Sequence, residues 1–330
     1  MAFRLKLGHR IEKEARRLLL EQTERALGEL GAAGDLPRTI HETRKCMKRI
    51  RSLLRLLKPG LKPAWFAAED RRYRTAARML SQLRDSHVTL QTLAKLEQAS
   101  DEKTREALGA ARGIMSPTSL EGPIATDPQA ILAETTVAIS AGRSAAAKLE
   151  LRRGGIETLA CGYAAILADG KRRFKAQRKA PTDEGLHELR KAVQHHWRHL
   201  QILSSAWPEL FEVRIATAKA IADQLGTDHD LSVLAAALED LPVDTLPERQ
   251  RDLVLARVRM AQNDIRHSYV PLARRLFADS PDGMANALCR QWRAAGRARA
   301  DRAETWPEAE NVTSIGAAKS ARRAREDQKA

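Results

Sequence analysis

The chain has 330 residues, of which 43% are hydrophobic and 4% aromatic, so it is long enough to bury a sizeable core rich in Leu and Ala. Lys and Arg number 57 against 42 Asp and Glu. The net charge of +15 points to an anionic partner such as nucleic acid, an anionic membrane surface or a polyphosphate. The start of the chain lacks an apolar signal core, and residues 158–168, the longest nearly apolar run, are too short to cross a bilayer. We therefore expect a cytoplasmic protein with no membrane insertion.

Amphipathic stretches separated by Gly and Pro follow one another along the chain, and none alternates polar and apolar residues as a strand does. The pairs Asp127-Pro128 and Ser280-Pro281 each place a capping side chain before a proline at the first helical position. These signals predict an all-α fold of about ten helices with no sheet.

Composition divides the chain into two parts and a tail. Residues 113–127 are rich in Gly, Pro, Ser and Thr, which predicts a linker between a first half, 1–112, and a second half, 128–300. Residues 301–330 lose their hydrophobic periodicity and are predicted to be a disordered tail of mixed charge. We therefore expect one helical domain over residues 1–300.

An internal repeat links the two halves. IHETRKCMKRIRSLLRLL, at residues 40–57, aligns without a gap with LHELRKAVQHHWRHLQIL, at residues 186–203. A second pair follows in the same order, LSQLRDSHVTL at 80–90 and ADQLGTDHDLSVL at 222–234. Two motifs in the same order predict a duplicated helical unit. The identical polar positions are His41 and His187, Glu42 and Glu188, Arg44 and Arg190, Lys45 and Lys191, and Asp85 and Asp230.

On a helix, each 18-residue segment has an apolar face opposite a basic face. From Arg38 to Lys58 there are eight Lys or Arg and one acid, whereas an ordinary solvated face mixes signs because i,i+4 pairs of opposite charge stabilise a helix. The pattern favours an anion-binding stripe over a merely solvated surface. The basic faces contain His41, Arg44, Lys45, Lys48 and Arg55 in the first segment and His187, Arg190, Lys191 and Arg198 in the second.

Several histidines have competing interpretations. His41 and His187 head the basic stripes, where they either donate to phosphate when protonated or serve as structural residues near a helix start. His195 and His199 have a spacing that can hold a metal, but no nearby carboxylate or cysteine completes a ligand set, so we expect neither a metal nor another cofactor. His196 falls on the apolar face and is predicted to be a hydrogen-bonded core residue.

The remaining polar candidates are structural by default. Asp85 and Asp230 either cap the next helix or orient the basic residues, and the sequence leaves both roles open. Cys46, Cys161 and Cys289 are isolated, without metal-ligand spacing, and are predicted to be small core residues of a reduced protein.

The two repeated motifs, together with ARRLFADSPDGMANALCRQW at residues 273–292, resemble the CHAD family, the conserved histidine α-helical domain. The resemblance covers residues 1–300. It implies two four-helix-bundle-like halves related by pseudo-two-fold symmetry, with a basic surface or channel between them that binds inorganic polyphosphate. It also implies association with polyphosphate or storage granules.

Carried over by position, the resemblance also implies a set of ligand residues, to which the helical projection adds Arg55. In the aligned repeat, the uncharged residues Gln194 and Trp197 of the second segment replace Lys48 and Arg51 of the first. We therefore expect the second half to bind more weakly. The implied polyphosphate-binding residues are His41, Arg44, Lys45, Lys48, Arg49, Arg51, His187, Arg190, Lys191, His195 and Arg198.

Catalysis is not expected. The sequence lacks the Glu-x-Glu-x-Lys start of the catalytic domains that accompany some relatives, and it lacks a Gly-rich phosphate-binding loop. We therefore predict a non-catalytic polyphosphate-binding module. The alternatives are a general polyanion- or nucleic-acid-binding protein, an accessory to a triphosphatase or polyphosphatase, and a granule scaffold. Because the stripes carry almost no aromatic residues for base stacking, nucleic acid would be a weak secondary partner. The oligomeric state stays open.

Overall fold

The computed structural model describes residues 3–32, 35–83, 85–116, 127–242 and 244–304, and within them all regular structure is helical. The predicted all-α fold is thereby confirmed. Most of the predicted linker and tail lie outside the described residues. No described helix has the length and apolar character that a bilayer-spanning segment requires.

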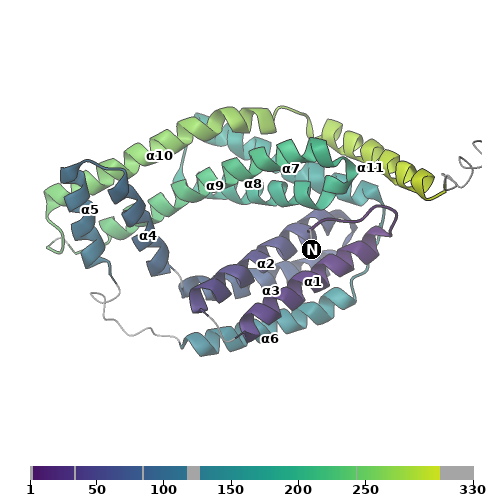
Figure 1. Cartoon of the computed structure of the whole chain (residues 1–330), viewed down its shortest axis with the longest axis horizontal. Helices are drawn as coiled ribbons and strands as arrows, with labels where there is room; N and C mark the ends of the chain where they lie inside the picture. Colours follow the sequence, from purple (N-terminus) through teal and green to yellow (C-terminus); the bar gives the residue numbers. More distant parts are fainter. Residues whose placement is uncertain (1–2, 33–34, 84, 117–126, 243, 305–330) are drawn as a thin grey trace, which may run out of the picture.

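Four helices form one bundle, in the lower part of Figure 1: α1 (Ile11–Gly31), α2 (Leu36–Leu57), α3 (Pro63–Gln82) and α6 (Pro128–Ala147). α1 and α3 each pack against both α2 and α6, which closes the bundle around a shared core. A single 3-10 turn, η1 (Lys58–Gly60), follows α2.

The second group of helices lies above the first in Figure 1. α8 (Asp183–Leu203) packs between α7 (Ile156–Lys179) and α9 (Pro208–Glu239), and a 3-10 turn, η2 (Ser204–Ala206), follows α8. α11 (Pro281–Glu304) packs against α7 and η2.

A helical hairpin completes the far end of this group. α4 (Asp85–Gln98) and α5 (Glu102–Ile114) pack on α9 and on α10 (Glu248–Leu276), on the left of Figure 1. Their shared core is separate from the main one and includes Leu93, Leu108, Leu234 and Val254. The hairpin ends at Ile114, near the start of residues 113–127, yet it packs on helices that follow this segment, whereas α6 packs back on α1 and α3.

Helix starts follow local sequence signals. The Asp127 carboxylate accepts a hydrogen bond from Gln129 N at 2.9 Å, and the Ser280 hydroxyl accepts one from Gly283 N at 3.0 Å. Both predicted caps are therefore confirmed. Thr182 is the N-cap of α8, and its hydroxyl accepts a hydrogen bond from Gly185 N at 3.1 Å.

The two groups of helices meet where α2 packs against α7 and α8. Gly162 of α7 makes this approach feasible, because a Cβ atom there would lie 2.0 Å from the carbonyl oxygen of Leu56. The contact turns the basic faces of α2 and α8 toward a common space.

Core predictions were partly wrong. Cys46 is buried as expected, but Cys161 is exposed and Cys289 is partly exposed. His196 is fully buried, yet neither of its ring nitrogens has a hydrogen-bond partner in the described part of the chain. The ring stacks on Tyr163 instead, with centroids 5.4 Å apart. The buried position of His196 was predicted correctly. Its predicted hydrogen bonding was wrong, because α7 places the Tyr163 ring against it.

Candidate anion-binding site

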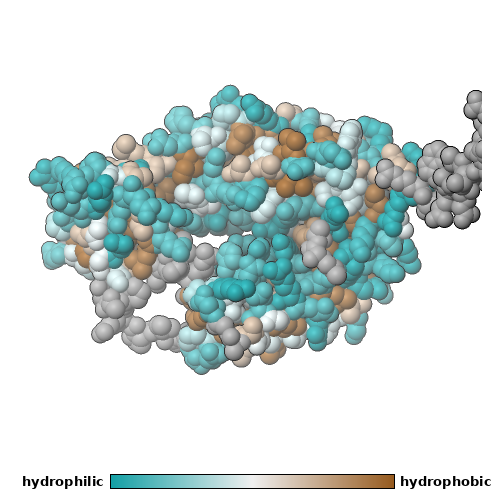
Figure 2. Space-filling model, viewed as in Figure 1, coloured by the Kyte–Doolittle hydropathy of each residue, from teal (hydrophilic) through white to brown (hydrophobic). Residues whose placement is uncertain are grey.

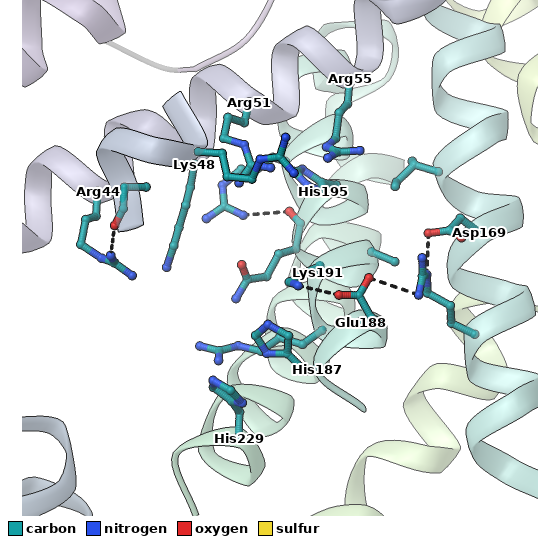
Figure 3. A pocket seen from close by; sticks show the side chains of 18 of the residues that line it. Arg44, Lys48, Arg51, Arg55, Asp169, His187, Glu188, Lys191, His195 and His229 are labelled. Atoms are coloured by element: carbon teal, nitrogen blue, oxygen red, sulfur yellow. Dashed lines mark hydrogen bonds and ion pairs between the residues drawn. The ribbon is translucent and has the colours of Figure 1, made fainter. Parts of the chain in front are cut away.

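A cavity of about 810 Å³ lies between α2 and α3 on one side and α7, α8 and α9 on the other (Figure 3). The space-filling view shows a hollow between the two groups of helices with hydrophilic residues around it (Figure 2). Ten Lys or Arg line the cavity against two acids. The basic residues are Arg44, Lys48, Arg51, Arg55, Arg74, Arg78, Arg173, Arg190, Lys191 and Arg198.

α2 contributes Arg44, Lys48, Arg51 and Arg55, whose spacing of four, three and four residues places them on one helical face. The Arg44 guanidinium donates to the Ala77 carbonyl and the Ser81 hydroxyl of α3. Asp70 holds Arg51 at 3.0 Å and Arg55 at 3.6 Å. These contacts to α3 orient the basic side chains of α2. Burial lowers the pKa of Arg55.

Arg198 of α8 departs from its predicted place on an outer polar face, because it is buried, with 7% of its surface exposed. Its guanidinium donates to the Gln194 carbonyl at 2.9 Å and lies 5.0 Å from the Trp197 ring centroid. Burial and nearby Arg49 lower its pKa to about 10. No described carboxylate forms an ion pair with it. The face is buried because α8 packs against α2 there.

His195 and His199 both bind α2 through Ser52. His195 Nδ1 lies 2.8 Å from the Ser52 hydroxyl, and His199 Nε2 lies 2.8 Å from the Ser52 carbonyl oxygen. Burial holds the pKa of His195 well below its ordinary value and lowers that of His199 to about 3, so both rings are neutral. The spacing that suggested a metal pair thus serves the contact between the helix groups.

His187 and His229 face each other near the other end of α8, with ring centroids 4.4 Å apart. Burial, followed by the charge of Lys191, lowers the pKa of His187. Burial and the charges of Arg190, His187 and Lys191 lower that of His229 to about 4. The pair is therefore neutral at pH 7.

Three residues expected in the site do not line the cavity: His41, Lys45 and Arg49. His41 and Lys45 lie beside Glu42, with the Lys45 amine 3.1 Å from its carboxylate. Arg49 turns toward α1, where it donates to the Gln22 side chain at 3.3 Å and lies over the Phe3 ring. These residues lie on a neighbouring face of α2, which points toward α1 instead of α8.

The structure adds Arg74 and Arg78 of α3 and Arg173 of α7 to the site. None of the three was predicted from the sequence. Arg74 and Arg78 are exposed like charges four residues apart, the same unfavourable spacing that marked the α2 stripe, so this signal was present. Arg173 gave no such signal, because it forms ion pairs with Asp169 at 2.7 Å and Glu188 at 3.3 Å.

The two acids in the cavity are already paired. Asp169 binds Arg172 and Arg173, and Glu188 binds Arg173 and Lys191. The remaining basic groups therefore leave the cavity strongly positive. Among the residues that line it there is no Phe, Tyr or Trp. Within the described chain, no three His, Cys, Asp or Glu side chains are grouped as a metal site.

The repeated aspartate positions differ in local structure. Asp85 is the first residue of α4, which starts a new helix, whereas Asp230 lies inside α9, which continues unbroken to Glu239. In the second copy the buried carboxylate is Asp228, which binds Arg266 at 3.0 Å. The sequence repeat therefore does not place the two aspartates in equivalent helix positions.

Two solved structures are similar to this chain. A chain described as PptA from Streptomyces chartreusis is 18% identical, with a TM-score of 0.50 over 82% of this chain and 98% of that one. A crystal structure of the CHAD domain from the plant Ricinus communis is 17% identical, with a TM-score of 0.45 over 89% of this chain and 95% of that one. A search of curated proteins gives no match. The family model of the CHAD domain matches residues 13–239. The chain therefore belongs to the CHAD domain family.

Proposed function

We propose that this protein binds inorganic polyphosphate, without hydrolysing it, in the cavity between α2 and α8. The observation that carries the proposal is the cavity itself, with ten basic residues and two acids that are both paired. Its volume falls in the range of about 300–1,000 Å³ of ordinary ligand pockets, so it suits several linked phosphates. Arg binds phosphate through two parallel donors and Lys supplies a mobile charge.

Arg198 supports an anionic ligand independently of the charge count. A buried cation without an anionic partner is costly, because its lost hydration is not replaced. Arg198 is 7% exposed and lines the cavity. A bound phosphate would supply the missing negative charge.

We also infer that the two basic helices descend from a duplicated unit with pseudo-two-fold symmetry. In chain order α1, α2 and η1 correspond to α7, α8 and η2, and α1 packs on α2 as α7 packs on α8. α5 and α6 correspond to α10 and α11 in the same way. Since α2 and α8 pack on each other, such a duplication would bring the two basic helices face to face.

Nucleic acid is the second candidate ligand, since backbone phosphates dominate its binding. The cavity offers no Phe, Tyr or Trp for bases to stack on, which disfavours it. A polyphosphate binder of this kind would act in the cytoplasm, on polyphosphate or storage granules, alone or beside a polyphosphate-hydrolysing enzyme.

The test is a titration of the purified protein with long-chain polyphosphate, with RNA of equal total charge as competitor. We expect polyphosphate to displace bound RNA at a smaller charge equivalent. The basic side chains of the cavity are closely spaced, as the phosphates of polyphosphate are, and the lining offers no Phe, Tyr or Trp on which bases could stack. Phosphate release is measured in the same samples with Mg²⁺ or Mn²⁺ present, and we expect none above a protein-free control. Preference for RNA would overturn the choice of ligand, and phosphate release would overturn the non-catalytic assignment.

A further inference from the structure

The cavity has two different ends. The outer part contains exposed basic side chains, among them Arg74, Arg78 and Lys191. The inner end, which we define as Arg51, Arg55, His195 and Arg198, is less exposed and lies where α8 meets α2 (Figure 3). His187 and His195 are eight residues apart, about 12 Å along the helix, so the histidine pair near His187 belongs to the other end.

His195 is the unusual group of the inner end. The Ser52 hydroxyl donates its one hydrogen to the Lys48 carbonyl at 2.8 Å. With that hydrogen on the Lys48 carbonyl, the hydroxyl oxygen accepts from His195 Nδ1, 2.8 Å away, and this arrangement assigns the ring's proton to Nδ1. The other nitrogen, Nε2, has no hydrogen-bond partner in the described part of the chain, and the ring lines the cavity. The neutral ring thus offers a hydrogen-bond acceptor among cationic donors.

Burial and the charges around His195 keep it neutral when the cavity holds no anion. Arg51 and Arg55 approach from α2 and Arg198 from α8, all positive, and His199 lies one turn further along α8. Asp70 of α3 pairs with Arg51 and Arg55, and Asp169 of α7 lies near Arg55. Burial is the main reason that the pKa of His195 lies well below its ordinary value, and these positive charges lower it further.

An inner phosphate of a polyphosphate chain carries no proton near neutral pH, so it cannot donate to a neutral imidazole. A terminal phosphate has a second ionisation with a pKa of about 6, so it can hold a proton or share one. Building on the proposed function, we propose that the inner end binds the terminal phosphate of the chain, with one proton shared between a terminal oxygen and His195 Nε2. Arg51, Arg55 and Arg198 neutralise the terminal charge, and the rest of the chain runs outward past Lys48 and Arg78.

Titration calorimetry at pH 6 tests this assignment with three ligands: linear tripolyphosphate, cyclic hexametaphosphate and long-chain polyphosphate. The cyclic ligand carries more charge and no chain end. We expect the linear ligand to bind about tenfold more tightly than the cyclic one, the size of one charge-assisted hydrogen bond. The linear ligand should also take up about half a proton, because its terminal phosphate is about half ionised at pH 6. The uptake is read from the dependence of the heat on the buffer's ionisation enthalpy.

Two histidine variants locate the effect. His195→Phe removes the acceptor and should abolish both the preference for the linear ligand and the proton uptake. His267→Phe is the matched control, because His267 is exposed on α10 and is not among the residues that line the cavity, and it should retain both. The wild-type comparison of linear with cyclic ligand stands even where His195→Phe does not fold.

The outcomes separate this inference from the proposed function. Binding of long-chain polyphosphate with equal or tighter binding of the cyclic ligand would overturn the terminal-phosphate site and leave the function standing. Failure of all three ligands to bind would overturn both.

Discussion

Reversing two charges of the cavity, in the double variant Lys48→Glu and Arg78→Glu, should weaken long-chain polyphosphate binding by about 60-fold or more at 50 mM salt. Both residues line the cavity, one from α2 and one from α3. For a single-stranded polyanion, each neutralised phosphate contributes about 0.7 to the slope of log affinity against log salt concentration. Loss of two contacts should therefore also reduce that slope by about 1.4.

A charge-matched variant controls for the loss of net charge. Lys103→Glu and Arg259→Glu alter exposed residues of α5 and α10 that do not line the cavity. Screening over about 8–10 Å at physiological salt limits their effect to a few-fold. Titrations at several salt concentrations, with circular dichroism to check folding, decide the comparison. Equal losses in the two double variants would refute the cavity as the binding site.

Acidification from pH 7.5 to pH 5 should lower the free energy of unfolding by about 4 kcal/mol through His196 and His199 alone. His196 and His199 are fully buried, and burial lowers the pKa of each to about 3. Because the folded-state pKa lies below the unfolded value near 6.5, the unfolded state binds more protons in this range. The stabilisation is complete above pH 6.5 and is lost as the pH falls toward 3, at about 2 kcal/mol per histidine by pH 5.

Denaturant unfolding across this pH range measures the effect, and His196→Phe isolates one half of it. The Phe ring can stack on Tyr163 without titrating, so the pH dependence should shrink by about 2 kcal/mol. Asp228, whose pKa burial raises, works in the opposite direction but is common to both proteins. His267→Phe should leave the curve unchanged, since His267 is exposed. Parallel curves for wild type and His196→Phe would contradict a neutral buried His196.

Local sequence features predicted the helices, their caps and the α2 stripe, because these depend on residues within a few turns of each other. Arg44, Lys48, Arg51 and Arg55 share one face by spacing alone. Sequence alone could not separate the face of α2 that lines the cavity from the adjacent face that points toward α1. Arg49, which lies on the adjacent face, was therefore predicted to be a ligand residue.

What the sequence analysis missed depends on packing between distant helices. Arg173 enters the site because α7 packs on α8, and Arg198 is buried because α8 packs on α2. No local sequence pattern predicts that the α4–α5 hairpin packs on α9 and α10. A polar stripe on one helix does not reveal whether solvent or another helix faces it.

The central claim, that polyphosphate occupies the cavity, is tested most directly by lysine footprinting. An amine-reactive reagent is applied with and without saturating polyphosphate, and labelling of each lysine is measured by mass spectrometry. Lys48 and Lys191 line the cavity, whereas Lys45, three residues from Lys48, pairs with Glu42 outside it, and Lys103 lies on α5. We expect polyphosphate to protect Lys48 and Lys191 strongly while Lys45 and Lys103 stay reactive. Equal protection of all four lysines, or protection of Lys45 without Lys48, would contradict binding in the cavity.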